Sequence, residues 1–173
     1  MTTSSLRERQ DPLRTRYRDE PAAASTSLHA RGDYRDPDVT CTVDGWAGPV
    51  RAGLHPATGG DGSDACSGDM LLEALLACSG VTLRSVATAM QVNVRSARLG
   101  VDGSFDARGT LGMARDVPVG VQDIVVTAEL DTDADDAALE RLARSTERYC
   151  VVAQSLREPV RFVVRRMTGG SMA

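Results

Sequence analysis

The longest apolar stretch of the chain covers residues 70–90, in which Glu73 and Arg84 are the only charged residues. It follows a polar, glycine-rich loop over residues 55–68. Ser67 is a suitable N-cap, because its hydroxyl can accept one of the backbone N–H groups left without a partner at a helix start. A long apolar run with so few charges predicts a helix that is buried nearly all round. We therefore expect the rest of the chain to pack around this helix.

Shorter segments with period-two alternation or β-branched residues lie on both sides of this helix and predict strands. The expected strands cover residues 25–30, 39–44, 50–54, 92–102, 121–131 and 160–166, with a further candidate within residues 103–117. Residues 133–154 return to apolar spacings of three and four, which predicts a second helix, and acidic residues at its start suit the helix dipole. This order of elements predicts an α+β fold.

A length of 173 residues suits one domain with a real hydrophobic core. We expect a flexible leader at residues 1–24, a single domain at 25–167 and a disordered tail at 168–173. Residues 1–20 lack the apolar core of a signal peptide, so the expected location is cytoplasmic. Residues 70–90 are long enough to cross a bilayer, but the two charges within them would be costly there, and we expect no membrane partner.

The charge and the glycine-rich loop argue against several partners. A net charge of −4 leaves no basic excess to neutralise nucleic-acid phosphates. The loop could cradle a phosphate, but it lacks the P-loop pattern, and Asp61 and Asp64 would repel an anion. These aspartates, with His55 and Cys66, match no closed metal site. We expect no bound cofactor and no metal.

Two of the four cysteines, Cys78 and Cys150, lie on the two predicted helices. A thiolate can attack a peroxide, and a second thiol can then condense with the sulfenic acid to give a disulfide. Free cysteines more often behave as small buried hydrophobes, so these residues alone leave both interpretations open, and Cys41 and Cys66 show no visible role. Because burial raises a thiol pKa, the peroxidase interpretation needs an arginine from elsewhere in the fold or from a second chain, oriented by a carboxylate.

Two motifs carry a resemblance to a known family. The stretch G-D-M-L-L-E-A-L-L-A-C-S-G-V-T-L-R-S-V-A around Cys78, and E-R-Y-C-V-V-A-Q-S-L around Cys150, resemble the two cysteine motifs of the OsmC/Ohr family. These are the osmotically induced and organic hydroperoxide resistance proteins, and the resemblance covers roughly residues 25–167. It implies curved antiparallel sheets around two central helices, an intertwined homodimer, and active sites at the dimer interface.

The resemblance also implies roles for individual residues. The protein would be a thiol-dependent peroxidase for organic hydroperoxides, with hydrogen peroxide as a further candidate substrate and an external dithiol as the electron donor. Cys78 would be the peroxidatic cysteine and Cys150 the resolving one. Asp69 stands where the family usually has a glutamate. It lies nine residues before Cys78, about 900° of helix rotation at ~100° per residue, which places the two on opposite faces of a regular helix. Glu73 is the alternative carboxylate.

The arginine of the family comes from the first strands. Arg35 is the best candidate here, with Arg31 and Arg51 as alternatives, and each is otherwise expected to be a solvated surface residue. Val151 stands where the family commonly has a proline after the second cysteine. The competing hypothesis is a non-enzymatic module on the same fold, either a redox sensor or a binder of small apolar ligands.

Overall fold

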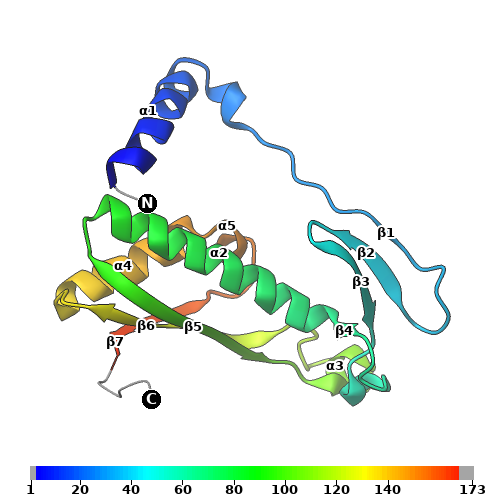
Figure 1. The fold of residues 1–173 in the computed structure, drawn as a ribbon. Helices are drawn as coiled ribbons and strands as arrows, with labels where there is room; N and C mark the ends of the chain where they lie inside the picture. Colours follow the sequence, from blue (N-terminus) through cyan, green and yellow to red (C-terminus); the bar gives the residue numbers. More distant parts are fainter. Residues whose placement is uncertain (1–2, 168–173) are drawn as a thin grey trace.

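The computed structural model describes residues 3–167, with the side chains of residues 3–5 excepted, so the tail predicted at residues 168–173 lies outside the described part. Two sheets are joined by the long helix α2 (Ser67–Ala89), as Figure 1 shows. The α+β architecture predicted from the sequence is confirmed. Each sheet contains one parallel pairing, β3 with β4 and β6 with β7, so the sheets are mixed rather than purely antiparallel.

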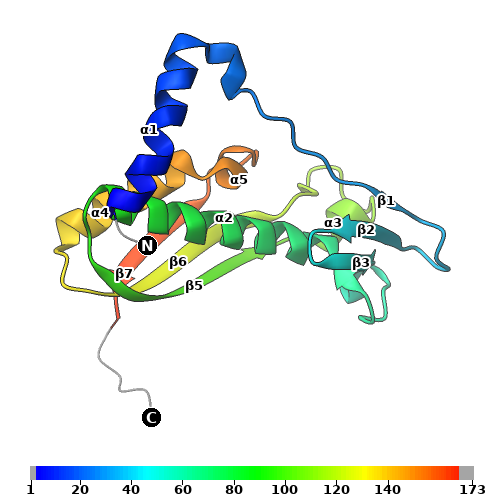
Figure 2. The ribbon, with the colours of Figure 1, turned by 45° about the horizontal axis from the view of Figure 1, so that its top comes forward.

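The C-terminal sheet has the strand order β5 (Val94–Ser104), β6 (Gln122–Thr132) and β7 (Arg161–Arg166). One of its faces is covered by α2, α4 (Asp136–Tyr149) and the short helix α5 (Val151–Gln154), as Figures 1 and 2 show. The middle strand alternates strictly, because every second residue points at these helices. Its buried residues are Ile124, Val126, Ala128, Leu130 and Thr132.

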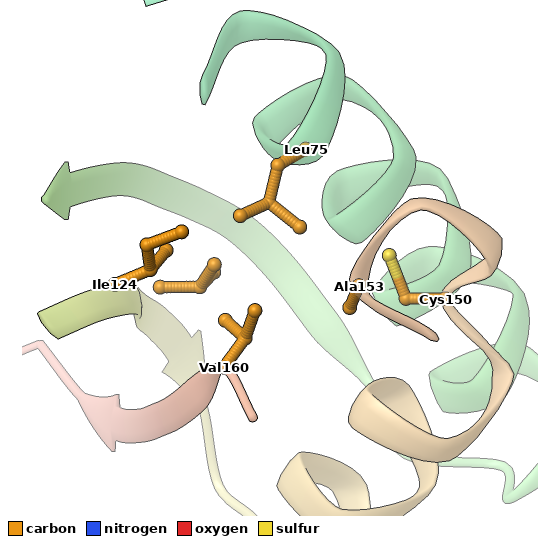
Figure 3. Packing of buried hydrophobic residues seen from close by; sticks show 6 residues of the cluster. Leu75, Ile124, Cys150, Ala153 and Val160 are labelled. Carbon is orange, nitrogen blue, oxygen red and sulfur yellow. The ribbon is translucent and has the colours of Figure 1, made fainter. Parts of the chain in front are cut away.

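The core lies between this sheet and the helices, in two clusters along α2. The cluster at the N-terminal half of α2 consists of Leu75, Ile124, Val126, Cys150, Ala153 and Val160. In Figure 3 Leu75 points from α2 toward Ile124 and Val160, with Ala153 and Cys150 beside them. The second cluster consists of Leu83, Ala87, Ala128, Leu130, Leu139 and Leu142. One thiol of the candidate pair is therefore part of the first cluster.

The other face of the C-terminal sheet carries paired charges. The strand register sets Arg98 of β5 and Arg165 of β7 on either side of Glu129 in β6, and both guanidinium groups form ion pairs with that carboxylate. Arg95 likewise bonds to Asp131 and Asp133. A sheet with one apolar and one charged face buries only the apolar side within this chain.

The N-terminal sheet has the order β1 (Gly32–Asp33), β2 (Cys41–Gly45), β3 (Gly48–Gly53) and β4 (Ala65–Cys66), and β4 leads directly into α2. It lies beyond the N-terminal end of α2, away from the C-terminal sheet, in both Figure 1 and Figure 2. Among the described residues of these four strands none is buried, and Trp46 at the β2–β3 turn is fully exposed. This sheet has no core of its own within a single chain.

The expectation that the central helix is buried nearly all round is wrong for the single chain. Only a stripe of every fourth residue is buried, namely Leu75, Ser79, Leu83 and Ala87, whereas Val81 is 73% exposed. The reason is that the sheet and α4 contact one face of α2 only. Among the described helices, α2 is the one whose length and composition would suit a membrane span, and here it packs on the C-terminal sheet. Cys66, without a side-chain bond, is the N-cap rather than Ser67.

The N-terminal region also differs from the expectation. Within the segment predicted to be a flexible leader, the structure has α1 (Thr3–Asp19) and the 3₁₀ helix η1 (Pro21–Ala24). Bonds within one helical turn, such as Arg14 to the side chain of Gln10 at 3.1 Å, help to hold α1 despite its polarity. Residues 25–30 are not a strand, because they run without a neighbouring strand to pair with.

Two further elements differ from the predicted order. The candidate strand within residues 103–117 is replaced after β5 by α3 (Ala107–Thr110), whose N-cap Asp106 accepts a bond from the Arg108 N–H. The single helix predicted at 133–154 is divided at Cys150 into α4 and α5. A further short helix, η2 (Pro56–Thr58), lies in the glycine-rich loop.

Candidate active site

The helix break at Cys150 organises the candidate site. This residue is the C-cap of α4 and the N-cap of α5, with an extended backbone at φ −76° and ψ 105°. Its own N–H still donates to the Thr146 carbonyl at 2.9 Å, and its carbonyl accepts from Gln154 at 3.0 Å. The N–H groups in the first turn of a helix have no partner within that helix. Those of residues 151–153 are therefore available to other acceptors.

Sulfur atoms accept these N–H groups. The N–H groups of Val152 and Val151 lower the pKa of Cys78 by hydrogen bonding to its sulfur, and that of Ala153 acts in the same way on Cys150. Cys150 is also among the groups that lower the pKa of Cys78, and Cys78 packs against the core cluster that contains Cys150, with both cysteines as free thiols. Packing of α2 against the α4–α5 junction thus brings together the two cysteines that the sequence singled out.

The two thiols differ in their acidity. Burial by itself raises the pKa of Cys78, but bonds donated by the Val152 N–H, the Cys150 thiol, the Thr82 hydroxyl and the Val151 N–H outweigh it, and the net pKa is lowered. Burial raises the pKa of Cys150, the Ala153 N–H and the Ser79 hydroxyl offset this in part, and the negative charge of Cys78 raises it further. The direction of both shifts favours Cys78 as the thiol that ionises first.

Cys78 lies at the border between the buried and the uncovered faces of α2. Cys78 is half-buried, whereas Cys150 is 0% exposed. Val81, three residues further on, lies about 60° around the helix from Cys78 on the uncovered side. Leu71, two turns earlier on the Cys78 side, lines a surface groove together with residues 117–125, residues 156–159 and Arg161. The groove does not include Cys78 itself, and its lining combines apolar residues with the charged Asp123, Arg157, Glu158 and Arg161.

The charged partners proposed for Cys78 are not beside it in this chain. Arg35 bonds to Asp33 near β1, with 87% of its side chain exposed. Arg51 pairs with Asp64 at 3.2 Å. Within residues 3–167, no arginine is among the groups that shift the Cys78 pKa. Hydrogen bonds, rather than a cation, stabilise the thiolate within one chain.

The carboxylate candidates are also apart from the cysteines. Asp69 lies inside the first turn of α2 and is exposed, so the regular helix places it on the face opposite Cys78. It is roughly 13 Å from Cys78 along the helix axis at 1.5 Å per residue. Glu73 is exposed as well. The catalytic roles of Asp69 and Arg35 stay predictions, because neither residue lies beside Cys78 within a single chain.

The sequence interpretation missed the groups that contact the sulfurs. Thr82 follows Cys78 by four residues on a helix, and this spacing alone could have identified it as a neighbour. Ser79 interrupts an apolar stripe, a signal that was equally available. The N–H groups of residues 151–153 could not be predicted as donors to the sulfurs, because no proline or glycine in this sequence marks the helix break at Cys150.

The glycine-rich loop shows no arrangement for a metal. Within the described residues there is no group of three or more His, Cys, Asp and Glu side chains that could hold one. His55 has a local role, since its Nδ1 accepts the Ala57 N–H at 3.0 Å and its ring meets the edge of Phe105 at 5.4 Å between centroids.

The sequence pattern of the family described as OsmC-like protein matches residues 60–165, which is more than half of the chain and includes Cys78 and Cys150. The chain belongs to the OsmC-like family. No curated protein sequence matches it. The resemblance drawn from the two cysteine motifs is thereby confirmed.

Solved structures share the OsmC-like fold at low identity. The OsmC-like protein from Mycoplasma pneumoniae is 15% identical, with a TM-score of 0.65 over 83% of this chain and 97% of that one. An organic hydroperoxide resistance protein OsmC from Legionella pneumophila is 14% identical, with a TM-score of 0.62 over 84% and 99%. The organic hydroperoxide resistance protein OhrB of Bacillus subtilis is 14% identical, with a TM-score of 0.54 over 81% and 98%. At these identities the likeness is one of fold.

Proposed function

We propose that this OsmC-like protein is a thiol-dependent peroxidase that reduces organic hydroperoxides. The observation that carries the proposal is the packing of Cys78 beside Cys150, in which the pKa of the half-buried Cys78 is lowered and that of the buried Cys150 is raised. A low-pKa, accessible thiolate beside a second thiol is the arrangement that peroxide reduction through a disulfide needs. Two proteins of similar fold are named as organic hydroperoxide resistance proteins, which supports the same substrate class.

The proposed reaction has three steps. The Cys78 thiolate attacks the terminal oxygen of the hydroperoxide, so that an S–O bond forms, the O–O bond breaks, and the alkoxide takes up a proton to leave as an alcohol. The Cys150 sulfur then attacks the Cys78 sulfenic acid, the S–S bond forms, and hydroxide leaves as water after taking up the Cys150 proton. An external dithiol finally reduces the disulfide by two thiol–disulfide exchanges and is itself oxidised to a disulfide.

We further propose that the working form is a homodimer in which a second copy covers α2. Val81 and neighbouring apolar residues of α2 are uncovered, and the N-terminal sheet has no buried residue in its described strands. Exposed apolar surface on this scale is typical of an interface. Because Cys78 borders the uncovered face, a partner there would complete its surroundings and could supply the missing arginine.

The peroxidase proposal is tested by consumption of cumene hydroperoxide in the presence of a dithiol. We expect Cys78→Ser to abolish the activity and Cys150→Ser to allow one oxidation that leaves a trappable sulfenic acid on Cys78. Cys41→Ser is the control, because Cys41 is an exposed free thiol that is not part of the Cys78–Cys150 pair, and we expect this variant to keep the wild-type rate. A wild-type protein as inert as Cys78→Ser, with several hydroperoxides and dithiols, would refute the enzyme and favour a non-enzymatic module.

The origin of the arginine is tested with mixed dimers. We expect Cys78→Ser and Arg35→Ala to be weakly active or inactive alone and to regain activity when their subunits are mixed. One site of the mixed dimer then combines an intact Cys78 with the partner subunit's Arg35. Mixing that restores no activity excludes Arg35 of the partner subunit as the supporting residue, and the same design applies to Arg31 and Arg51.

The dimer itself is tested with Val81→Arg, which should convert the dimer to a monomer in light-scattering measurements.

A further inference from the structure

Ser79 occupies an unusual position for a polar residue. It belongs to the buried stripe of α2, between Leu75 and Leu83, and is only 1% exposed. A buried hydroxyl destabilises a fold unless it is hydrogen-bonded, so an alanine would be the simpler choice for packing alone. The position follows Cys78 directly in the sequence. Packing alone therefore does not explain why a hydroxyl is present at this position.

The hydroxyl of Ser79 is bonded to the second thiol of the site. Its Oγ lies 3.6 Å from the Sγ of Cys150, which is 0% exposed. Two consecutive residues of α2 thus lie beside Cys150. Cys78 is at the edge of the buried face of the helix, and Ser79 is within that face. Ser79 also lines a small cavity with Thr146 of α4, whose own hydroxyl is directed to the Leu142 carbonyl at 2.8 Å. The two buried hydroxyls therefore have different partners.

We propose that Ser79 is a positioning residue for the resolving step, holding the Cys150 sulfur beside Cys78 and donating a hydrogen bond to it as it becomes the nucleophile. This inference rests on the proposed peroxidase function. The two thiols have different hydrogen-bond donors. The N–H groups of residues 151 and 152 and the Thr82 hydroxyl lower the pKa of Cys78, whereas the Ser79 hydroxyl and the Ala153 N–H lower that of Cys150.

The acidity of Cys150 explains why such a donor matters. Cys78 is the one titratable side chain, among the described residues of α2, α4 and α5, that affects the Cys150 pKa, and it acts to raise it together with burial. Once Cys78 is a neutral sulfenic acid, its negative charge no longer opposes the ionisation of Cys150. Cys150 must then lose its proton to attack, and the Ser79 O–H stabilises the thiolate that forms.

The test is Ser79→Ala, in which the two oxidation steps are followed separately by rapid mixing with cumene hydroperoxide, quenching and mass spectrometry. We expect sulfenic acid to form on Cys78 at the wild-type rate. The Cys78–Cys150 disulfide should form about three- to tenfold more slowly, the size expected for the loss of one hydrogen bond. Thr146→Val is the matched control, because it also removes a buried hydroxyl that lines the same cavity but does not bond to Cys150. Equal slowing in both variants would assign the effect to packing and overturn the proposal.

A second measurement does not need peroxide chemistry. In a protein whose only thiol is Cys150, with Cys41→Ser, Cys66→Ser and Cys78→Ala, thiolate absorbance is followed against pH. Adding Ser79→Ala should move the midpoint upward by about half to one pH unit. An unchanged midpoint overturns the role of Ser79 even if the enzyme is active. If the midpoint moves upward but the wild-type protein reduces no hydroperoxide, the hydrogen bond between Ser79 and Cys150 is supported and the proposed peroxidase function is wrong.

Discussion

Replacing Thr82 by valine tests whether hydrogen bonds set the reactivity of Cys78. The two side chains lie one helical turn apart on α2, and the Thr82 hydroxyl donates to the Cys78 sulfur. Valine keeps the shape of threonine and removes the donor. The bond favours the thiolate over the thiol, so its loss should raise the Cys78 pKa. The thiolate is the attacking form, so less of it is present at neutral pH in the variant.

The expected size follows from the remaining contacts. A hydrogen bond to a charged group contributes about 1.5 kcal/mol or more, which corresponds to about one pKa unit. Two backbone N–H groups and the Cys150 thiol still donate to the sulfur, and Cys78 is partly exposed, so we expect a rise of about half to one unit. Below the pKa the oxidation of Cys78 should then be about three- to tenfold slower.

The assay is the single-turnover rate of Cys78 oxidation by cumene hydroperoxide, measured from about pH 5 to about pH 10 to span the ordinary thiol pKa. The wild-type rate should rise with pH through the lowered Cys78 pKa and then level off. The Thr82→Val curve should be displaced to higher pH and reach the same plateau or a slightly higher one, because a more basic thiolate is a better nucleophile.

Thr88→Val is the matched control for this prediction. Thr88 is on the same helix, ten residues from Cys78, and its hydroxyl donates to the Arg84 carbonyl at 2.8 Å. We expect its pH curve to coincide with that of the wild type. If Thr82→Val also coincides with both, the lowered pKa of Cys78 does not depend on this hydroxyl, and the reasoning from hydrogen bonds is wrong.

Three further predictions concern stability and are measured by urea unfolding. Leu75→Ala, at a fully buried position, should lower the free energy of unfolding by about 2–5 kcal/mol, whereas Val119→Ala in the exposed loop should change it by less than about 0.5 kcal/mol; equal effects would contradict the assigned core. Bonds from Arg108 lower the pKa of Asp106 to about 2 from its ordinary 3.8. The stability that this carboxylate contributes should therefore be complete above about pH 5 and disappear as the pH falls toward 2, so the difference between wild type and Asp106→Asn should shrink in acid. Glu129→Gln should cause a small loss of stability that fades in about 1 M salt, because its arginine partners are exposed; a loss independent of salt would argue against an ion-pair origin.

The sequence identified the candidate pair and the elements that carry it. Residues 70–90 could be predicted as a helix because a long apolar run without proline has few other stable forms. The strands at 92–102, 121–131 and 160–166 followed from their alternation, which the pleat of a half-buried sheet imposes. Cys78 and Cys150 could be named from their motifs, since such motifs are local. Apolar spacing shows which residues avoid water, but it does not show whether the same chain covers them, as Val81 demonstrates.

The tertiary structure decided how the two thiols are tuned. The break at Cys150 occurs without proline or glycine, and the N–H groups it releases are accepted by sulfurs from α2 and from the junction itself. Local propensity could not predict this break, because Cys78, whose sulfur accepts the released N–H groups, lies 72 residues before Cys150. The sequence by itself thus determined the long helix, the strands of the C-terminal sheet and the identity of the cysteines, because each depends on neighbours along the chain. Only the packed structure decided which thiol ionises first, because that depends on hydrogen-bond donors and burial contributed by distant segments.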